Sequence, residues 1–109
     1  MSYDSKFKRK DIDEFFRAVM LLENEEECYR FFEDICTIKE LQAIAQRMRV
    51  ACLLDSGSNY LEVSEATGAS SATISRVNRC LNYGSGYREA IDNLKKAGKL
   101  NDDGSDLEK

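Results

Sequence analysis

Residues 60–81 read YLEVSEATGASSATISRVNRCL, and this stretch decides the fold class. Its pattern is that of two short helices joined by a tight turn, the arrangement called a helix-turn-helix. Gly68 closes the turn, and Ser64, four residues earlier, is small enough for the second helix to cross the first. Ile74 and Val77, six and nine residues after the glycine, give the second helix its apolar inner face. The turn, the crossing and the inner face therefore all predict a helix-turn-helix.

The outward positions of the second helix carry short polar or basic side chains, which are the kinds that contact DNA. Short side chains near a helix start let the backbone approach base edges, and hydroxyl groups can bond to bases or phosphates. Arginines further along can reach phosphates or a guanine edge. Thr67 and Ala69 depart from the pattern, because an apolar residue usually precedes the glycine and a larger one usually follows it. We predict that residues 60–82 bind DNA, with contacts from Asn59, Ser70, Ser71, Thr73, Ser75, Arg76 and Arg79.

Helical periodicity continues on both sides of this stretch. Apolar spacing predicts six helices and no strands, near residues 12–20, 25–35, 38–55, 60–67, 71–82 and 87–97. Asn24, Asn59 and Ser70 are placed to cap three of them, and Thr37 with Glu40 has the spacing of a capping box at the start of the longest. We therefore predict an all-α fold of six helices.

Composition excludes several classes of protein. The 109 residues suffice for one domain and include no histidine, so an imidazole base and a histidine-ligated metal are both excluded. No stretch approaches the roughly 18 apolar residues of a membrane span, and the start of the chain does not read as a signal peptide. We predict a cytoplasmic protein that is not an enzyme and has no cofactor. Without C-x-x-C spacing, the four cysteines are expected to be buried, reduced thiols: Cys28, Cys36, Cys52 and Cys80.

Charge is distributed unevenly along the chain. The net charge is −4, which taken alone argues against DNA binding. Residues 11–36 carry nine acidic and two basic residues, whereas residues 37–99 carry nine basic and six acidic ones. Because phosphate neutralisation is local, the acidic helices do not exclude a DNA-binding surface within residues 37–99.

Composition also divides the chain into three parts. Residues 1–10 form a flexible basic arm, which either is solvated or touches phosphate. Residues 11–98 form the helical domain, and residues 99–109 form an acidic tail that we expect to be disordered. The first three helices carry many large apolar residues, which belong either to an ordinary core or to the interface of a homodimer. We favour the homodimer, because three such helices cannot easily bury so many large side chains alone.

Three stretches resemble the Trp repressor superfamily, and within it the YerC/YecD branch. Residues 37–40, TIKE, resemble the threonine-led start of the family's long helix. Residues 46–50, QRMRV, resemble its T-R-V-R-I stretch, and residues 68–76, GASSATISR, resemble G-A-G-I-A-T-I-T-R in register. The resemblance covers about residues 11–96 and implies an intertwined homodimer whose two reading heads address a palindromic operator about one DNA turn apart.

The resemblance also implies a possible effector pocket. In the Trp repressor, residues matching Thr37, Arg47 and Arg76 hold the carboxylate and amine of tryptophan. Val77 stands here where the repressor has a glycine, and its side chain would occupy space that an indole ring needs. Cys80 stands where the repressor has a serine, and a thiol is a poorer partner for an ammonium group. We therefore expect an effector other than tryptophan, or none, and Arg47 could instead pair with a carboxylate such as Glu40.

The resemblance implies that Ser71, Ala72 and Thr73 approach the bases in the major groove, partly through water. It also implies a difference elsewhere on the DNA face. Leu61 and Ser64 stand where the repressor has basic residues, so phosphate contacts would depend on Arg76, Arg79, Lys95 or the basic arm.

Two functions fit the sequence. The first is a repressor that binds double-stranded DNA as a homodimer, without dependence on tryptophan. The alternative is a helical dimerisation or adaptor module that keeps the helix-turn-helix shape without binding DNA, with the acidic helices as its partner surface.

Overall fold

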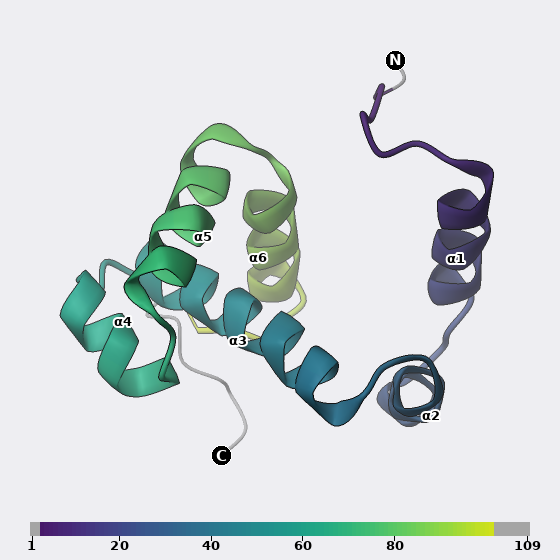
Figure 1. Ribbon diagram of the computed structural model, residues 1–109, viewed down its shortest axis with the longest axis horizontal. Coiled ribbons are helices and arrows are strands. Elements are labelled where there is room, and N and C mark those ends of the chain that lie inside the picture. The colour runs from purple at the N-terminus through teal and green to yellow at the C-terminus, as the bar shows by residue number, and fades with distance from the viewer. Residues whose placement is uncertain (1–2, 102–109) are drawn as a thin grey trace. The chain divides into compact units, whose positions relative to one another are not determined.

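The computed structural model describes residues 3–101, and this range contains six helices and no strand (Figure 1). The helices are α1 (Lys10–Met20), α2 (Glu25–Ile35), α3 (Ile38–Asp55), α4 (Tyr60–Thr67), α5 (Ser71–Tyr83) and α6 (Gly86–Lys96). The predicted all-α class and the order of the helices are confirmed. The chain divides into two units, Met1–Lys39 and Glu40–Lys109, which are described separately. No helix within the described range is long and apolar enough to cross a membrane.

The first unit holds α1 and α2 and is built around phenylalanine rings. Phe15 of α1 lies 6.0 Å from Phe31 and 6.3 Å from Phe32 of α2, measured between ring centroids. The predicted cap is present, because the Asn24 side chain accepts a hydrogen bond from the backbone N–H of Glu27 at 2.9 Å. Neither helix contains a buried residue. The aromatic contacts therefore orient the two helices without producing a closed core.

The second unit contains the hydrophobic core. Its buried residues come from α3, α4, α5, α6 and the segments that follow α4 and α6: Val50, Ala51, Cys52, Val63, Ala69, Ile74, Val77, Leu81, Ile91 and Leu100. In this unit α5 packs against both α4 and α6. A shared core of this kind holds α5 by one face and leaves the opposite face free.

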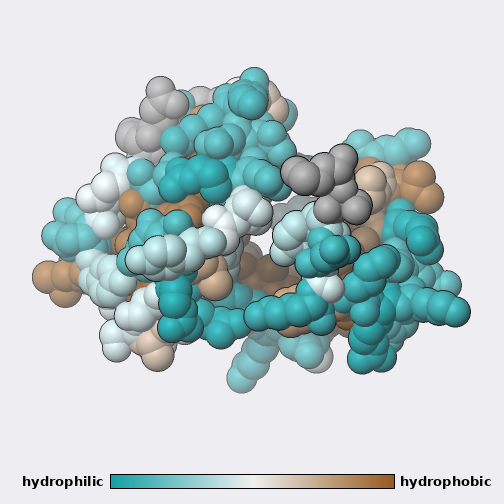
Figure 2. Space-filling model, turned by 90° about the horizontal axis from the view of Figure 1, so that it is seen from above, coloured by the Kyte–Doolittle hydropathy of each residue, from teal (hydrophilic) through white to brown (hydrophobic). Residues whose placement is uncertain are grey.

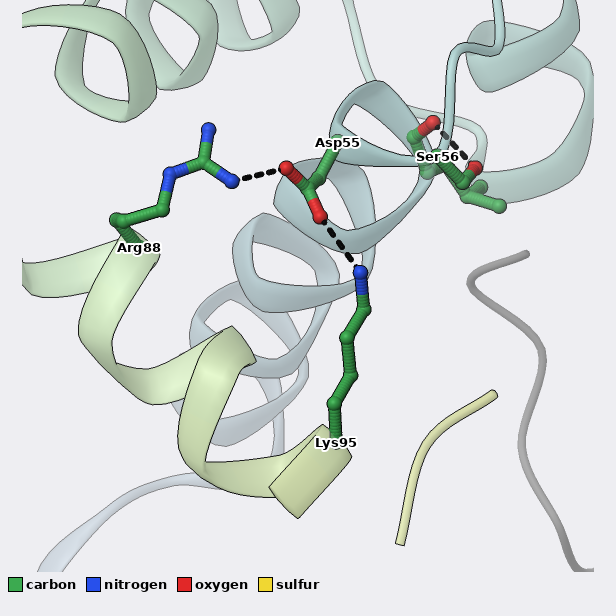
Figure 3. Close-up of polar contacts among 5 residues, drawn as sticks. Asp55, Ser56, Arg88 and Lys95 are labelled. Atoms are coloured by element: carbon green, nitrogen blue, oxygen red, sulfur yellow. Dashed lines mark hydrogen bonds and ion pairs between the residues drawn. The ribbon is translucent and has the colours of Figure 1, made fainter. Parts of the chain in front are cut away.

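An ion-pair network fixes α6 to the end of α3 (Figure 3). Asp55, the last residue of α3, receives hydrogen bonds from Arg88 and Lys95 of α6, the second at 3.1 Å. The Asp55 side chain is only 10% exposed. Burial by itself would raise the pKa of Asp55, but the two cationic donors outweigh that effect and lower the pKa below its ordinary value of 3.8.

Contacts with the helical domain extend beyond the boundary expected at residue 98. Gly98 adopts a left-handed φ of 72°, which turns the chain back at the end of α6. The N–H of Lys99 then donates to the carbonyl of Leu94 at 2.9 Å, and Leu100 is buried in the core. Lys99 and Leu100, which we expected to belong to the disordered acidic tail, therefore contact the helical domain, and residues 102–109 of that expected tail lie outside the described range.

The expectation that all four cysteines are buried is wrong. Cys52 of α3 is buried and Cys36 is half-buried, but Cys28 of α2 and Cys80 of α5 are exposed. No residue of α2 is buried, and the buried side of α5 consists of Ile74, Val77 and Leu81, so neither helix covers its cysteine. All four are free thiols, as expected.

Candidate nucleic-acid interface

The turn between α4 and α5 has the features that residues 60–82 predicted. Gly68 adopts a left-handed φ of 73°, and its N–H donates to the carbonyl of Ser64 at 2.8 Å. A residue with a side chain would be strained in this conformation, which explains the glycine. Ser70 then caps α5 by accepting a hydrogen bond from the backbone N–H of Thr73 at 3.2 Å. Only three residues, 68–70, separate the two helices.

The two faces of α5 differ sharply. Ile74, Val77 and Leu81 are buried and fix the helix to the core. The opposite face is open to solvent and carries Ser71, Ala72, Ser75, Arg76 and Arg79. Neither arginine forms an ion pair with any residue between 3 and 101. The exposed face of α5 therefore offers two unneutralised positive charges beside short polar side chains.

Three of the residues predicted to contact DNA also have structural roles. The Asn59 side chain accepts a hydrogen bond from the N–H of Glu62 at 2.9 Å, and the Glu62 carboxylate accepts one from the N–H of Asn59 at 2.8 Å. The Ser70 hydroxyl donates to the Thr73 hydroxyl at 3.1 Å, and Thr73 is half-buried. These side chains hold the starts of α4 and α5 in place.

The other cations considered for phosphate contact are largely committed to carboxylates. Lys95 pairs with Asp55, so its expected availability for DNA is not borne out. In the basic arm, Lys8 pairs with Asp13 at 2.6 Å and Arg9 with Asp11 at 2.8 Å. The free cations that share a helix with the predicted reading residues are therefore Arg76 and Arg79.

The five residues of the predicted effector pocket differ in burial and in the unit to which they belong. Thr37 belongs to the first unit, and the other four residues belong to the second. Val77 is 1% exposed and lies in the core, whereas Arg76 and Cys80 are exposed. Arg47 is half-buried on α3 and makes no ion pair in the described part of the chain, so a pair with Glu40 is absent.

The depression found in the second unit uses none of these residues. It is open to solvent, has a volume of about 240 Å³, and is lined by Ala45, Met48, Arg49, Cys52, Leu94, Lys99 and Leu100. Its walls come from α3, α6 and the segment after α6. Across residues 3–101, no group of three cysteine or carboxylate side chains is placed to hold a metal ion.

One residue with a role at the turn was not predicted from the sequence. The side-chain amide of Gln46, on α3, donates to the backbone carbonyl of Thr67 at 3.1 Å. The two residues are 21 positions apart. No local pattern indicates such a contact, and the only signal was that Thr67 departs from the usual apolar residue.

The order of six helices, with a tight glycine turn before an exposed polar helix, defines a Trp-repressor-like all-α protein. The chain belongs to the Trp repressor family, because the family model described as Trp repressor protein matches residues 10–95. This is a family of regulatory DNA-binding proteins and not of enzymes.

One bacterial relative is similar in sequence, and two more are similar in both sequence and fold. The chain is 50% identical over 92 residues to YerC of Bacillus subtilis (strain 168), itself uncharacterized, covering 84% of this chain and 88% of YerC. A Staphylococcus aureus structure, provisionally described as a Trp repressor, is 43% identical with a TM-score of 0.79, covering 83% of this chain and 91% of that one. A TrpR-like protein from Eubacterium eligens ATCC 27750 is 44% identical with a TM-score of 0.79, covering 88% and 97%.

Proposed function

We propose that this protein is a cytoplasmic repressor that binds a specific palindromic operator as a homodimer, with α4 and α5 serving as a helix-turn-helix. The observation that carries the proposal is the exposed face of α5, where Arg76 and Arg79 have no carboxylate partner among the described residues. Short side chains at Ser71 and Ala72 let the start of the helix approach base edges. The two arginines then supply the positive charge that binding to phosphates requires.

The short helices and exposed apolar side chains of the first unit support the proposal of a homodimer. Each of α1 and α2 has 11 residues, and isolated helices shorter than about 12–15 residues are only marginally stable in water. Without a buried residue, this helix pair lacks the packing that normally stabilises short helices. Large apolar side chains are instead open to solvent in this unit, namely Phe16, Met20, Leu21, Tyr29 and Ile35. Figure 2 shows brown, apolar surface on this unit. A second copy of the chain would cover such a surface.

Independence from tryptophan is part of the proposal. Val77 is buried in the core beside the exposed Arg76, so its side chain fills the position where the repressor has only a glycine. Titration calorimetry of the purified protein with tryptophan should show no binding at micromolar ligand. A dissociation constant in the micromolar range would contradict this part of the proposal.

Selection from fragmented genomic DNA at modest salt tests the DNA-binding function. The protein should enrich one palindromic sequence, and the logarithm of the binding constant should fall steeply with the logarithm of salt concentration. Arg76→Ala should weaken operator binding and reduce that slope by about one if Arg76 contacts phosphate. Arg17→Ala is a matched control, because it removes the same charge from an exposed position on α1.

The alternative function predicts a different result in the same selection. If no sequence is enriched while the protein still forms a dimer, the adaptor module is the better account. The acidic first and second helices would then be the partner surface. Arg76→Ala would have no effect on the assembly in that case.

A further inference from the structure

Hydrogen bonds from several side chains hold the turn between α4 and α5. The Thr67 hydroxyl donates to the carbonyl of Val63 at 2.8 Å and accepts from the N–H of Ala69 at 3.1 Å. Ala69 is buried, so the turn places a side chain in the core two residues after the end of α4. Thr67 therefore stabilises the turn with hydrogen bonds, whereas an apolar residue at this position usually stabilises it by packing.

Gln46 extends this network to the long helix. The last carbonyls of a helix have no partner within the helix and need one from elsewhere. The carbonyl of Thr67, the last residue of α4, obtains its partner from the Gln46 side chain at 3.1 Å. Both residues are half-buried, so water competes less for this hydrogen bond than it would at the surface.

The location of this contact connects it to DNA binding. Thr67 lies four residues before Ser71, where α5 begins and where the predicted base contacts are concentrated. Base recognition requires side chains to be held within about 0.5 Å of the correct geometry, whereas contacts with phosphates tolerate more variation. A contact that fixes the turn therefore matters most for sequence-specific binding.

We propose that Gln46 is a positioning residue for DNA recognition, because its amide holds the α4–α5 turn in the conformation that presents α5. This inference rests on the proposed function. Gln46 does not itself contact DNA, and it acts through the Thr67 carbonyl.

Gln46→Met tests the inference, because methionine has a similar length and no hydrogen-bond donor. Loss of one hydrogen bond of this kind should weaken binding to the selected operator by about five- to tenfold. Binding to a duplex of random sequence should stay within about twofold, since phosphate contacts alone sustain it. The backbone amide of Ala69 should also exchange hydrogen faster in the variant. Gln42→Met, at an exposed position one turn earlier on α3, is the matched control.

The outcomes separate this inference from the proposed function. A wild-type protein that enriches no DNA sequence would overturn the proposed function and this inference with it. A wild-type protein that binds an operator which Gln46→Met binds equally tightly would overturn the role of Gln46 alone. A general loss of protein stability would lower the melting temperature and weaken binding to both duplexes equally. An unchanged ratio between the operator affinity and the random-duplex affinity would therefore also count against the inference.

Discussion

The surroundings of Asp55 show how a single side chain contributes to the stability of the fold. Its carboxylate is largely buried and accepts hydrogen bonds from two cations of α6 (Figure 3). Because the two donors lower the pKa of Asp55 in the folded state, the charged form stabilises the fold. That contribution is complete above the ordinary pKa of 3.8, and it is lost as the pH falls through the lower pKa of the folded state.

Asp55→Asn should lower the free energy of unfolding at neutral pH by about 1–2 kcal/mol, a value reduced by the solvent exposure of Arg88. The difference between wild type and variant should shrink as the pH is lowered below about 4. Urea denaturation at several pH values measures both effects. Asp92→Asn, at an exposed position on α6, is the control and should change stability little. A constant difference between pH 7 and pH 3 would show that the charge of Asp55 is not what stabilises the contact.

At the scale of the helix, Asn59 combines a cap with a predicted DNA contact. Asn59→Ala should destabilise the protein by about 1 kcal/mol, because it removes the side-chain bond to the N–H of Glu62. Asn59→Asp should keep the cap, since aspartate is as good a cap as asparagine, but should weaken operator binding because its charge repels phosphate. Thermal unfolding and a DNA-binding titration of the two variants separate these roles.

Asn24 provides the matched comparison, because it caps α2 outside the α4–α5 pair. Asn24→Ala and Asn24→Asp should repeat the stability pattern and leave DNA affinity unchanged. If Asn59→Asp binds the operator as tightly as the wild type, Asn59 is a cap and nothing more.

The helices themselves were predictable because their signals are local. Asn24, Asn59 and Ser70 mark three helix starts, and each accepts the capping hydrogen bond that its position implies. The glycine turn at Gly68 and the inward side chains of α5 follow from the same short-range spacing. The family resemblance added the expectation of an intertwined dimer, which periodicity alone leaves open.

Contacts between residues far apart in the sequence were not predictable. Asp55 meets Arg88 and Lys95 across 33 and 40 positions, and a single sequence contains no sign of that pairing. Gln46 and Thr67 were missed for the same reason. The exposure of Cys28 and Cys80 was missed because helical spacing identifies the apolar side of a helix but not the width of the surface that covers it.

At the scale of the whole molecule, the separation of charge by segment is what we expect if one segment assembles the dimer and another binds DNA. The acidic residues concentrate in residues 11–36, which also carry the exposed apolar side chains of α1 and α2. Residues 37–99, which include α5, carry a net positive charge. Acidic surface on the first unit would repel DNA there, so phosphate contact would be left to α5. The first unit would then serve assembly.

Assembly through the first unit leads to the last prediction. The wild type should sediment as a dimer of about twice 12.4 kDa, since apolar side chains left open on α1 and α2 would then be covered. Met20→Glu should raise the dimer dissociation constant by about tenfold or more, because burying a charge in an apolar interface is costly. Sedimentation equilibrium over a range of concentrations measures the change.

Tyr83→Glu is the control for that measurement, since Tyr83 is as exposed as Met20, at 87% against 81%, but lies at the end of α5. It should leave the dissociation constant unchanged if α1 and α2 make the interface. A wild type that remains monomeric at all concentrations would contradict the dimer. A dimer that Tyr83→Glu weakens and Met20→Glu does not would place its interface on the second unit, and the exposed apolar residues of α1 and α2 would then need another partner.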